Sequence, residues 1–449
     1  MAVYSIIKKS QLEGTHRLDA EYYQPEYLEI NRKISHFNNF FLGDLIHSFA
    51  SGKNLPQADN GKIFFLRTQN IGRVLINKEG MNFLAPNIEK YPVLNEGDIL
   101  AVRVGEGVGN TSIVTPKFAK HSYSDNVIRF RIEKLDPYFI IIFLNSRIGF
   151  NYLERVSKGS ARSLISSENI YSIRVPDLGQ KVSNFCKKAI LEGAKEVEQS
   201  ESLYLQAEDL LLEELDLKNF QPEDDLSYIV NLSDVKKVHR ADAEYFQPKY
   251  EKLVQKIKEN KIEHLGNLVV MKKGIEPGSN EYQNEGKLFI RVSNMSKYEI
   301  TDKGQKYLSN ELYQKLKDNF EPKIGEILLT KDATPGIAYV MKEPIEGIIS
   351  SGILRLELKE KDIEEEYLAL CLNSIIGQMQ AERDGGGSII THWKPEQIKN
   401  LQIPILPKST QQKITDLVRK SHQARKQAKQ LLEQAKQKVE ELIENSQNF

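Results

Sequence analysis

Hydrophobic positions along the chain alternate between two patterns. Short apolar runs bounded by Gly, Pro and Asn are typical of β-strands, and they occur in two sets, at 62–68, 98–104 and 126–132 and again at 287–293, 326–331 and 352–358. A longer segment with helical spacing follows each set, at 136–156 and at 364–384. The pattern predicts an α+β fold built from two similar mixed α/β units, without the regular β–α alternation of a dinucleotide-binding fold.

Two long helices are predicted after these units. Residues 411–445 contain no Pro or Gly, and their apolar and small residues recur every three or four positions, as in a coiled-coil seam: Ile414, Leu417, Ser421, Ala424, Ala428, Leu431, Ala435, Val439 and Leu442. Residues 181–215 offer a less regular seam of Val182, Phe185, Ala189, Val197, Leu203, Leu205, Leu210, Leu212 and Leu215. We expect the two helices to pair in antiparallel order.

The charges of the two helices favour this pairing. Residues 181–215 hold four Lys and eight Asp or Glu, a net charge of −4, whereas residues 408–445 hold nine Lys or Arg and five Asp or Glu, a net charge of +4. Helices of opposite charge prefer each other to copies of themselves. The alternative is that both charge runs are solvated faces, but the apolar seams favour pairing.

An internal repeat organises the whole chain. The segment HRLDAEYYQPEYLEINRKI (16–34) returns 223 positions later as HRADAEYFQPKYEKLVQKI (239–257). Weaker matches continue in the same order: 41–46 with 264–269, 96–103 with 325–331, 144–149 with 372–377, and 169–176 with 397–404. A period near 225 residues indicates a duplicated domain pair, because solenoid repeats are far shorter, about 20–50 residues. The predicted order is a mixed α/β globular unit at 1–168, a helical spacer at 169–222, a second globular unit at 223–395 and a second spacer at 396–449, with a pseudo-twofold relation between the halves.

Composition narrows the class of protein. The chain is 40% hydrophobic and 28% charged, as in a globular protein, and it has no apolar run long enough to span a membrane. Its start lacks a signal peptide, so we expect a cytoplasmic location and no membrane partner. The two cysteines, Cys186 and Cys371, form no metal-ligand spacing and no disulfide framework, and we expect buried, inert thiols.

The formal net charge is zero, from 62 Lys and Arg against 62 Asp and Glu. A simple nucleic-acid-binding protein usually has a positive surplus. Charge acts locally, over about a Debye length, so a neutral total does not exclude DNA binding, and partner subunits can supply positive surface.

The organisation resembles the specificity subunit of type I restriction–modification systems over nearly the whole chain. In that family two target-recognition domains alternate with two helical regions. The stretches EGDILAVRVGEGVGNTSIV (96–114) and GEILLTKDATPGIAYV (325–340) look like its strand-and-loop segments. NIYSIRVPDLGQKV (169–182) and QIKNLQIPILPKSTQQKI (397–414) look like its entry into the conserved helices.

The resemblance implies a non-catalytic subunit that binds double-stranded DNA at a bipartite, asymmetric target. It further implies assembly with two methyltransferase subunits and with restriction subunits. The partners would use S-adenosylmethionine for adenine methylation, or ATP and magnesium for translocation and cleavage. We therefore expect no cofactor, metal or catalytic residue in this chain.

The motifs that would indicate catalysis are missing from the sequence. It has no [DN]-P-P-[YF] methyltransferase motif, no GxxxxGK[ST] phosphate loop and no His cluster with metal-ligand spacing. The glycines of RVGEGVGNTS, Gly105, Gly107 and Gly109, fit a turn close to DNA or to another backbone better than a phosphate cradle. The acidic pairs Asp19/Glu21 and Asp242/Glu244 are alternatives as catalytic carboxylates, but no nuclease-like Lys or His spacing accompanies them.

Base-contacting residues in DNA-binding proteins are mainly Arg, Lys, Asn, Gln, Ser and Thr that reach the major groove. The candidates of this type at strand ends or in Gly-rich loops are Arg67, Gln69, Asn70, Arg103, Lys158, Ser160 and Arg162 in the first unit, and Arg291, Ser293, Asn294, Lys331, Thr334, Arg383 and Ser388 in the second. Repeat-matched pairs such as Arg67/Arg291 and Asn70/Asn294 fit phosphate positioning or structure better than base reading. Unmatched residues such as Arg162 and Thr334 are the better base readers.

Some features leave alternatives open. Trp393 fits packing under its domain better than stacking on a base, and the duplicated HRxDAEYxQP motif fits either a structural latch or a docking surface for a partner. For the whole chain the alternatives are an enzyme with hidden catalysis and a protein-binding adaptor whose helices oligomerise.

Overall fold

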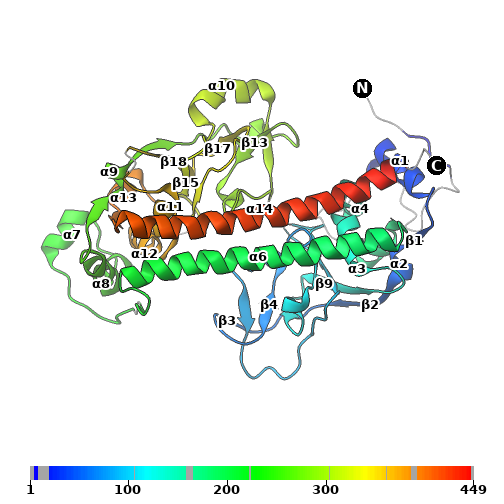
Figure 1. Ribbon diagram of the computed structural model, residues 1–449, viewed down its shortest axis with the longest axis horizontal. Helices are drawn as coiled ribbons and strands as arrows, with labels where there is room; N and C mark the ends of the chain where they lie inside the picture. The colour runs from blue at the N-terminus through cyan, green and yellow to red at the C-terminus, as the bar shows by residue number, and fades with distance from the viewer. Residues whose placement is uncertain are drawn as a thin grey trace. The chain divides into compact units, whose positions relative to one another are not determined.

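The computed structural model describes residues 5–8, 20–105, 107–157, 165–221, 224–302, 304–359, 362–385 and 392–445. Packing divides the chain into unit 1, which comprises residues 1–198 and 426–449, and unit 2, which comprises residues 199–425. Figure 1 labels the main elements of both. Each unit combines small sheets with helices, as predicted.

Within the described residues, unit 1 contains two four-stranded sheets and one two-stranded sheet, with strand orders β2-β9-β6-β7, β3-β5-β4-β8 and β1-β10. Strand β8 is parallel to β4, and the other paired neighbours are antiparallel. The strands are β1 (Asn39–Phe41), β2 (Ile46–Ser51), β3 (Gln57–Ala58), β4 (Phe64–Leu66), β5 (Asn82–Leu84), β6 (Ile99–Val102), β7 (Thr111–Ile113), β8 (Ser122–Tyr123), β9 (Val127–Ile132) and β10 (Arg174–Pro176).

Unit 2, in its described part, has sheets of four, three and two strands, with orders β12-β18-β15-β16, β14-β13-β17 and β11-β19. Strand β17 is parallel to β13. The strands are β11 (Ile262–His264), β12 (Val269–Lys273), β13 (Lys287–Ile290), β14 (Lys306–Leu308), β15 (Ile327–Thr330), β16 (Ala338–Val340), β17 (Gly347–Ile349), β18 (Ile353–Leu358) and β19 (Gln402–Pro404). The six strands predicted from apolar runs are all confirmed, as β4, β6, β9, β13, β15 and β18.

Each predicted helix between the strands and the long helices is in fact two helices. Unit 1 has α3 (Pro137–Asn145) and α4 (Arg147–Ser157), and unit 2 has α11 (Glu365–Asn373) and α12 (Ile375–Asp384). The chain breaks at Ser146 and Ser374, which have extended backbones. A glycine three residues later lets the two helices touch, because a Cβ on Gly149 or Gly377 would lie 2.0 or 2.2 Å from a carbonyl oxygen of the preceding helix.

The smaller helices frame these cores. In unit 1 they are α1 (Pro25–Ile34), α2 (Leu42–Leu45) and α5 (Ser167–Tyr171). In unit 2 they are α7 (Leu232–Val238), α8 (Pro248–Ile257), α9 (Leu265–Leu268), α10 (Asn310–Phe320) and α13 (Pro395–Lys399). In the described residues, no helix is long and apolar enough to cross a membrane.

The two long helices are α6 (Gln180–Glu214) and α14 (Lys408–Glu444). In unit 1, early α6 residues such as Cys186 and Ile190 share a core cluster with late α14 residues such as Val439 and Ile443. In unit 2, late α6 residues share a cluster with early α14 residues: Tyr204, Ala207, Leu211, Ile414 and Val418. The predicted antiparallel pairing of the helices is confirmed.

The predicted seams are partly wrong in register. On α6, Phe185 and Leu205 are exposed, by 43% and 58%, while Cys186 and Tyr204 are buried beside them. On α14, Leu417, Leu431 and Leu442 are half-buried, and Val418 and Ile443 take the buried positions. A helix that packs against both a partner helix and a globular core has a wider apolar face than a two-helix seam, so spacing alone misplaces its centre.

Both cysteines lie in cores, as predicted. Burial raises the pKa of the Cys186 and Cys371 thiols to about 12, so both are protonated and unreactive at neutral pH. Trp393 is 1% exposed within the main core of unit 2, which confirms the packing interpretation. The pseudo-twofold relation of the halves and the four domain boundaries stay predictions.

Candidate nucleic-acid interface

In unit 1 the turn after β6 meets the segment that follows α4. The backbone N–H of Ile165 donates to the carbonyl oxygen of Arg103 at 3.1 Å, and the Arg103 side chain is exposed. The turn is formed by Gly105, Gly107 and Gly109, with φ angles of +97°, +87° and +95°, which favour glycine. The structure therefore brings Arg103 next to Ile165. The candidates Lys158, Ser160 and Arg162 lie outside the described residues.

Unit 2 has the same connection at the matching place. The backbone N–H of Trp393 donates to the carbonyl oxygen of Lys331 at 2.8 Å. Thr334 is exposed in the turn after β15, and its carbonyl oxygen accepts a bond from Thr330 Oγ1 at 2.5 Å. The candidate Ser388 lies outside the described residues.

Lys331 is less available than the sequence implied. It is 8% exposed, and its Nζ donates to Asp332 Oδ2 at 2.6 Å. Asp332 Oδ1 lies 2.8 Å from Nδ1 of the exposed His392. Burial acts to raise the pKa of Asp332, but its bonds with Lys331 and His392 outweigh burial and lower it below its ordinary value. These contacts fix the turn to the segment before α13.

Arg67 and Arg291 begin matching one-turn helices, η3 (Thr68–Asn70) and η7 (Val292–Asn294). Each guanidinium donates through Nη2 to the carbonyl oxygen of a glycine thirteen residues later, Gly80 at 3.1 Å for Arg67 and Gly304 for Arg291. Both side chains are half-buried. Their orientation is thus fixed by the fold before any ligand binds.

Asn70 and Asn294 hold these loops from inside. Both are fully buried, and each Oδ1 accepts the backbone N–H of the preceding arginine, Arg67 or Arg291, at 3.0 Å. Their Nδ2 atoms donate to backbone carbonyls seven residues later, at 3.1 and 3.2 Å. Both asparagines therefore stabilise the folded loop. DNA contact by either stays a prediction and would need the loop to open.

The residues that lie between each arginine and its asparagine differ between the two units. Gln69 is exposed and donates to the Gly80 carbonyl oxygen at 2.7 Å, whereas Ser293 is exposed without a hydrogen bond in the described part of the chain. The hydrogen bonds of Arg67/Asn70 and Arg291/Asn294 therefore match, while the exposed side chains between them differ.

Arg383 lies at the end of α12, half-buried, where Nε donates to Asp384 Oδ1 at 2.9 Å and the guanidinium is 5.6 Å from the Tyr245 ring. Its repeat counterpart Arg155 is 1% exposed and stacks 3.8 Å from the Tyr22 ring. The position serves packing in both units, and DNA contact by Arg383 stays a prediction.

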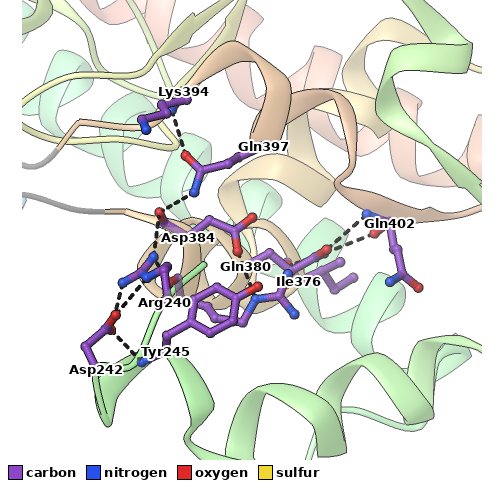
Figure 2. A network of polar contacts seen from close by, with 10 residues as sticks. Arg240, Asp242, Tyr245, Ile376, Gln380, Asp384, Lys394, Gln397 and Gln402 are labelled. Carbon is purple, nitrogen blue, oxygen red and sulfur yellow. Dashed lines mark hydrogen bonds and ion pairs between the residues drawn. The ribbon is translucent and has the colours of Figure 1, made fainter. Parts of the chain in front are cut away.

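The second copy of the duplicated motif forms an internal latch, which Figure 2 shows. Arg240 Nη1 donates to the carbonyl oxygens of Arg383 and Asp384, both at 3.2 Å. Its Nε and Nη2 donate to Asp242 at 2.8 Å, which lowers the pKa of Asp242. Gln397 Nε2 donates to the Asp384 carbonyl oxygen at 2.8 Å. In unit 2 the motif is therefore tied to the end of α12, where Gln397 of α13 donates to one of the same carbonyl oxygens, and Asp242 is a structural carboxylate. Residues 16–19 of the first copy lie outside the described residues.

Three polar residues near these loops were not among the residues predicted from the sequence. Gln57 and Asn82 join Arg67 through neighbouring strands, and His392 joins Asp332. The strand pairings that bring them together are long-range, so no local spacing indicates them. The acidic run Glu364, Glu365 and Glu366 is also clustered, but Arg419 and Lys342 pair with Glu366, which makes it an ion-pair network within unit 2.

The comparisons with known proteins agree with the sequence-based resemblance. Residues 255–437 match the family model described as the type I restriction modification DNA specificity domain. No curated protein matches the sequence.

Among solved structures, the chain is similar to the S subunit of a type I restriction-modification system from M. genitalium, with 14% identity over 91% of this chain and 96% of that chain and a TM-score of 0.39. The HsdS subunit from Thermoanaerobacter tengcongensis matches with 13% identity over 97% and 100% and a TM-score of 0.29. The type IIG restriction endonuclease BpuSI matches with 10% identity over 45% and 35% and a TM-score of 0.30.

Residues 255–437, which cover most of unit 2 and the greater part of α14, therefore carry the sequence signature of the type I restriction modification DNA specificity domain.

Proposed function

We propose that the chain is the DNA-recognition subunit of a type I restriction–modification complex and that each unit reads one half of a bipartite, asymmetric target. The observation that supports this most is the shared loop arrangement. In each unit a strand-end turn and the segment after the helix pair join at one backbone bond, Ile165 to Arg103 or Trp393 to Lys331. The framework is the same and the exposed side chains differ, so the two units would prefer different bases.

The long helices would set the spacing of the two half-sites. A helix of 35 residues is about 52 Å long at 1.5 Å per residue, and major-groove sites one turn apart are separated by about 34–36 Å. A rigid spacer of this size spans one to two turns of DNA. The covalent link also gives the second unit a high effective concentration once the first has bound.

The chemistry would belong to partner subunits. We expect two methyltransferase subunits that bind S-adenosylmethionine, and restriction subunits that use ATP and magnesium, while this chain contributes no catalytic group. An exposed apolar segment supports a scaffolding role: Leu226, Ile229 and Leu232 of unit 2 are 106%, 98% and 66% exposed, and apolar side chains grouped on a surface are typical of protein contacts.

A titration of the purified chain, alone and with its methyltransferase partner, against random duplex DNA tests the proposal. We expect binding whose affinity falls with salt, with a slope of log K against log salt of about −0.9 per phosphate contacted, and selection of a two-part sequence. Methyl transfer by the chain alone would contradict the non-catalytic assignment. Binding that ignores salt would favour the protein-binding adaptor.

A further inference from the structure

A network of hydrogen bonds in unit 1 joins Gln57, Asn82, Arg67, Gln69 and the carbonyl oxygen of Gly80. We call this network the relay. Gln57 Oε1 accepts from Asn82 Nδ2 at 3.1 Å, and Asn82 Oδ1 accepts from Arg67 Nη2 at 3.3 Å. Arg67 Nη2 and Gln69 Nε2 both donate to the Gly80 carbonyl oxygen, at 3.1 and 2.7 Å. The members come from β3, β5 and the turn after β4, so long-range strand pairing holds them together.

The relay leaves polar atoms facing solvent. Gln57 and Gln69 are exposed. In the part of the chain that the structure describes, the amide nitrogen of Gln57 and the amide oxygen of Gln69 have no protein partner, so one offers N–H donors and the other an acceptor. Their remaining amide atoms are already bonded, which fixes the direction in which the free atoms point. A preorganised donor and acceptor lose little conformational freedom on binding.

Gly80 makes the arrangement possible. Its φ of +60° favours glycine, and a Cβ there would lie 2.9 Å from Gln69 Nε2. The carbonyl oxygen of Gly80 can therefore accept both side chains at once. Gly304, at φ +54°, is its counterpart in unit 2 and accepts from Arg291 in the same way.

The comparison with unit 2 separates the constant members of the relay from the variable ones. At the offset of 224 that relates Arg67 to Arg291 and Gly80 to Gly304, Asn82 corresponds to Lys306 and Gln69 to Ser293. The arginine and its glycine are thus retained, while the two side chains beside them change in size, charge and hydrogen-bonding pattern. A retained cation suits the phosphate backbone, which is the same at every sequence, and changed side chains suit bases.

We propose that this relay determines the base preference of unit 1: Gln69 and Gln57 contact purine edges in the major groove, and Asn82 is the positioning residue that aligns Gln57 with Arg67. The inference rests on the proposed function. The chemical match is that the major-groove edge of adenine presents an acceptor at N7 and a donor at N6, so the free N–H groups of Gln57 can donate and the free amide oxygen of Gln69 can accept.

The test uses the full chain with its methyltransferase partner and selects bound sequences from random duplex DNA. The variants replace the relay with the side chains of unit 2, as Gln69→Ser and Asn82→Lys. We expect each to lower the preference at one or two adjacent positions of one half-site by about tenfold and to leave the other half-site unchanged. Asn60→Lys, at an exposed position in the same unit, adds the same charge outside the relay and should change affinity for all sequences alike.

Two results would overturn the inference. If wild type selects a two-part sequence and neither relay variant alters base preference, the relay does not read DNA, although the proposed function stands. If wild type selects no sequence, the proposed function itself fails and the relay assignment falls with it. Gln69→Ser changes an exposed side chain, so unfolding of the Asn82→Lys variant would leave the first outcome measurable.

Discussion

The two strand-end turns differ in how their shape is specified. In unit 1 the turn after β6 depends on backbone conformation, with positive φ at Gly105, Gly107 and Gly109. In unit 2 the turn after β15 also has positive φ, at Ala333 and Gly336, but side chains hold it as well, because Asp332 joins Lys331 to His392 and Thr330 bonds to the carbonyl oxygen of Thr334. Loops at corresponding places on the two sheets can therefore differ in sequence while the strands beneath them keep their pairing.

The sheets beneath the two turns also differ, in how each neutralises a buried carboxylate. Glu326 and Asp98 occupy matching positions before β15 and β6, and both are buried. Glu326 pairs with Arg355, which lies opposite Leu328 of β15. The corresponding arginine of unit 1 is Arg129, which lies opposite Leu100 of β6. Asp98 pairs instead with Arg131, two residues further along β9. Each unit neutralises its carboxylate, but the arginine comes from a different place.

The largest effect is expected from breaking the more buried of these pairs. Arg355 and Glu326 have side chains that are 2% and 5% exposed, so Arg355→Met leaves a buried charge unpaired and should destabilise unit 2 by about 3–5 kcal/mol. The matched variant Arg131→Met should cost less, because the Arg131 side chain is 29% exposed. Hydrogen exchange of the β15 and β6 amides measures both, and equal losses would contradict the comparison.

The latch of unit 2 should give the next largest effect. Arg240→Ala removes a charged donor from two backbone carbonyls and from Asp242, at a cost of about 1.5–3 kcal/mol. Hydrogen exchange should increase at the end of α12 and in α13. Lys315→Ala, which removes an exposed pair with Glu311, is the control and should change neither; unaltered exchange in the Arg240 variant would rule out the latch.

Two substitutions of opposite sign test how the turns are specified. Gly105→Ala places a side chain at φ +97° with open space around it, so backbone strain should loosen the turn by about 1 kcal/mol. Ala333→Gly relieves a positive φ of +60° in the other turn and should be neutral or stabilising by less than about 1 kcal/mol. Local hydrogen-exchange rates show whether each variant stabilises or destabilises its turn. A Gly105→Ala variant that stabilises its turn would contradict the conclusion that the positive φ of Gly105 shapes this turn.

The smallest effect is a pH dependence in unit 2. Because the folded state lowers the pKa of Asp332, its contribution to the turn is present at neutral pH and is lost as pH falls through that lowered pKa. Trp393 is the one tryptophan in the sequence and follows His392 directly, so its fluorescence reports on the turn. We expect an acid-dependent change in wild type that is absent from Asp332→Asn; an identical titration of both would remove Asp332 as the cause.

Local patterns predicted much of the fold. The apolar runs located six strands, and the absence of Pro and Gly located α14. The patterns misplaced Phe185 and Leu205, because each half of α6 packs against a globular core as well as against α14. They also missed the relay of Gln57 and Asn82, since β3 and β5 meet only through tertiary pairing. Asn70 was a natural candidate by residue type, and its full burial becomes visible only with the loop folded around it.

Independent reading by the two units is tested most directly by exchange of one recognition surface. Residues 40–165 of the chain would be replaced by the matching segment of a relative with a different target, and the bound sequences selected from random duplex DNA. The account predicts that one half of the target changes while the other half and the spacer length are retained. A simultaneous change of both halves would contradict it.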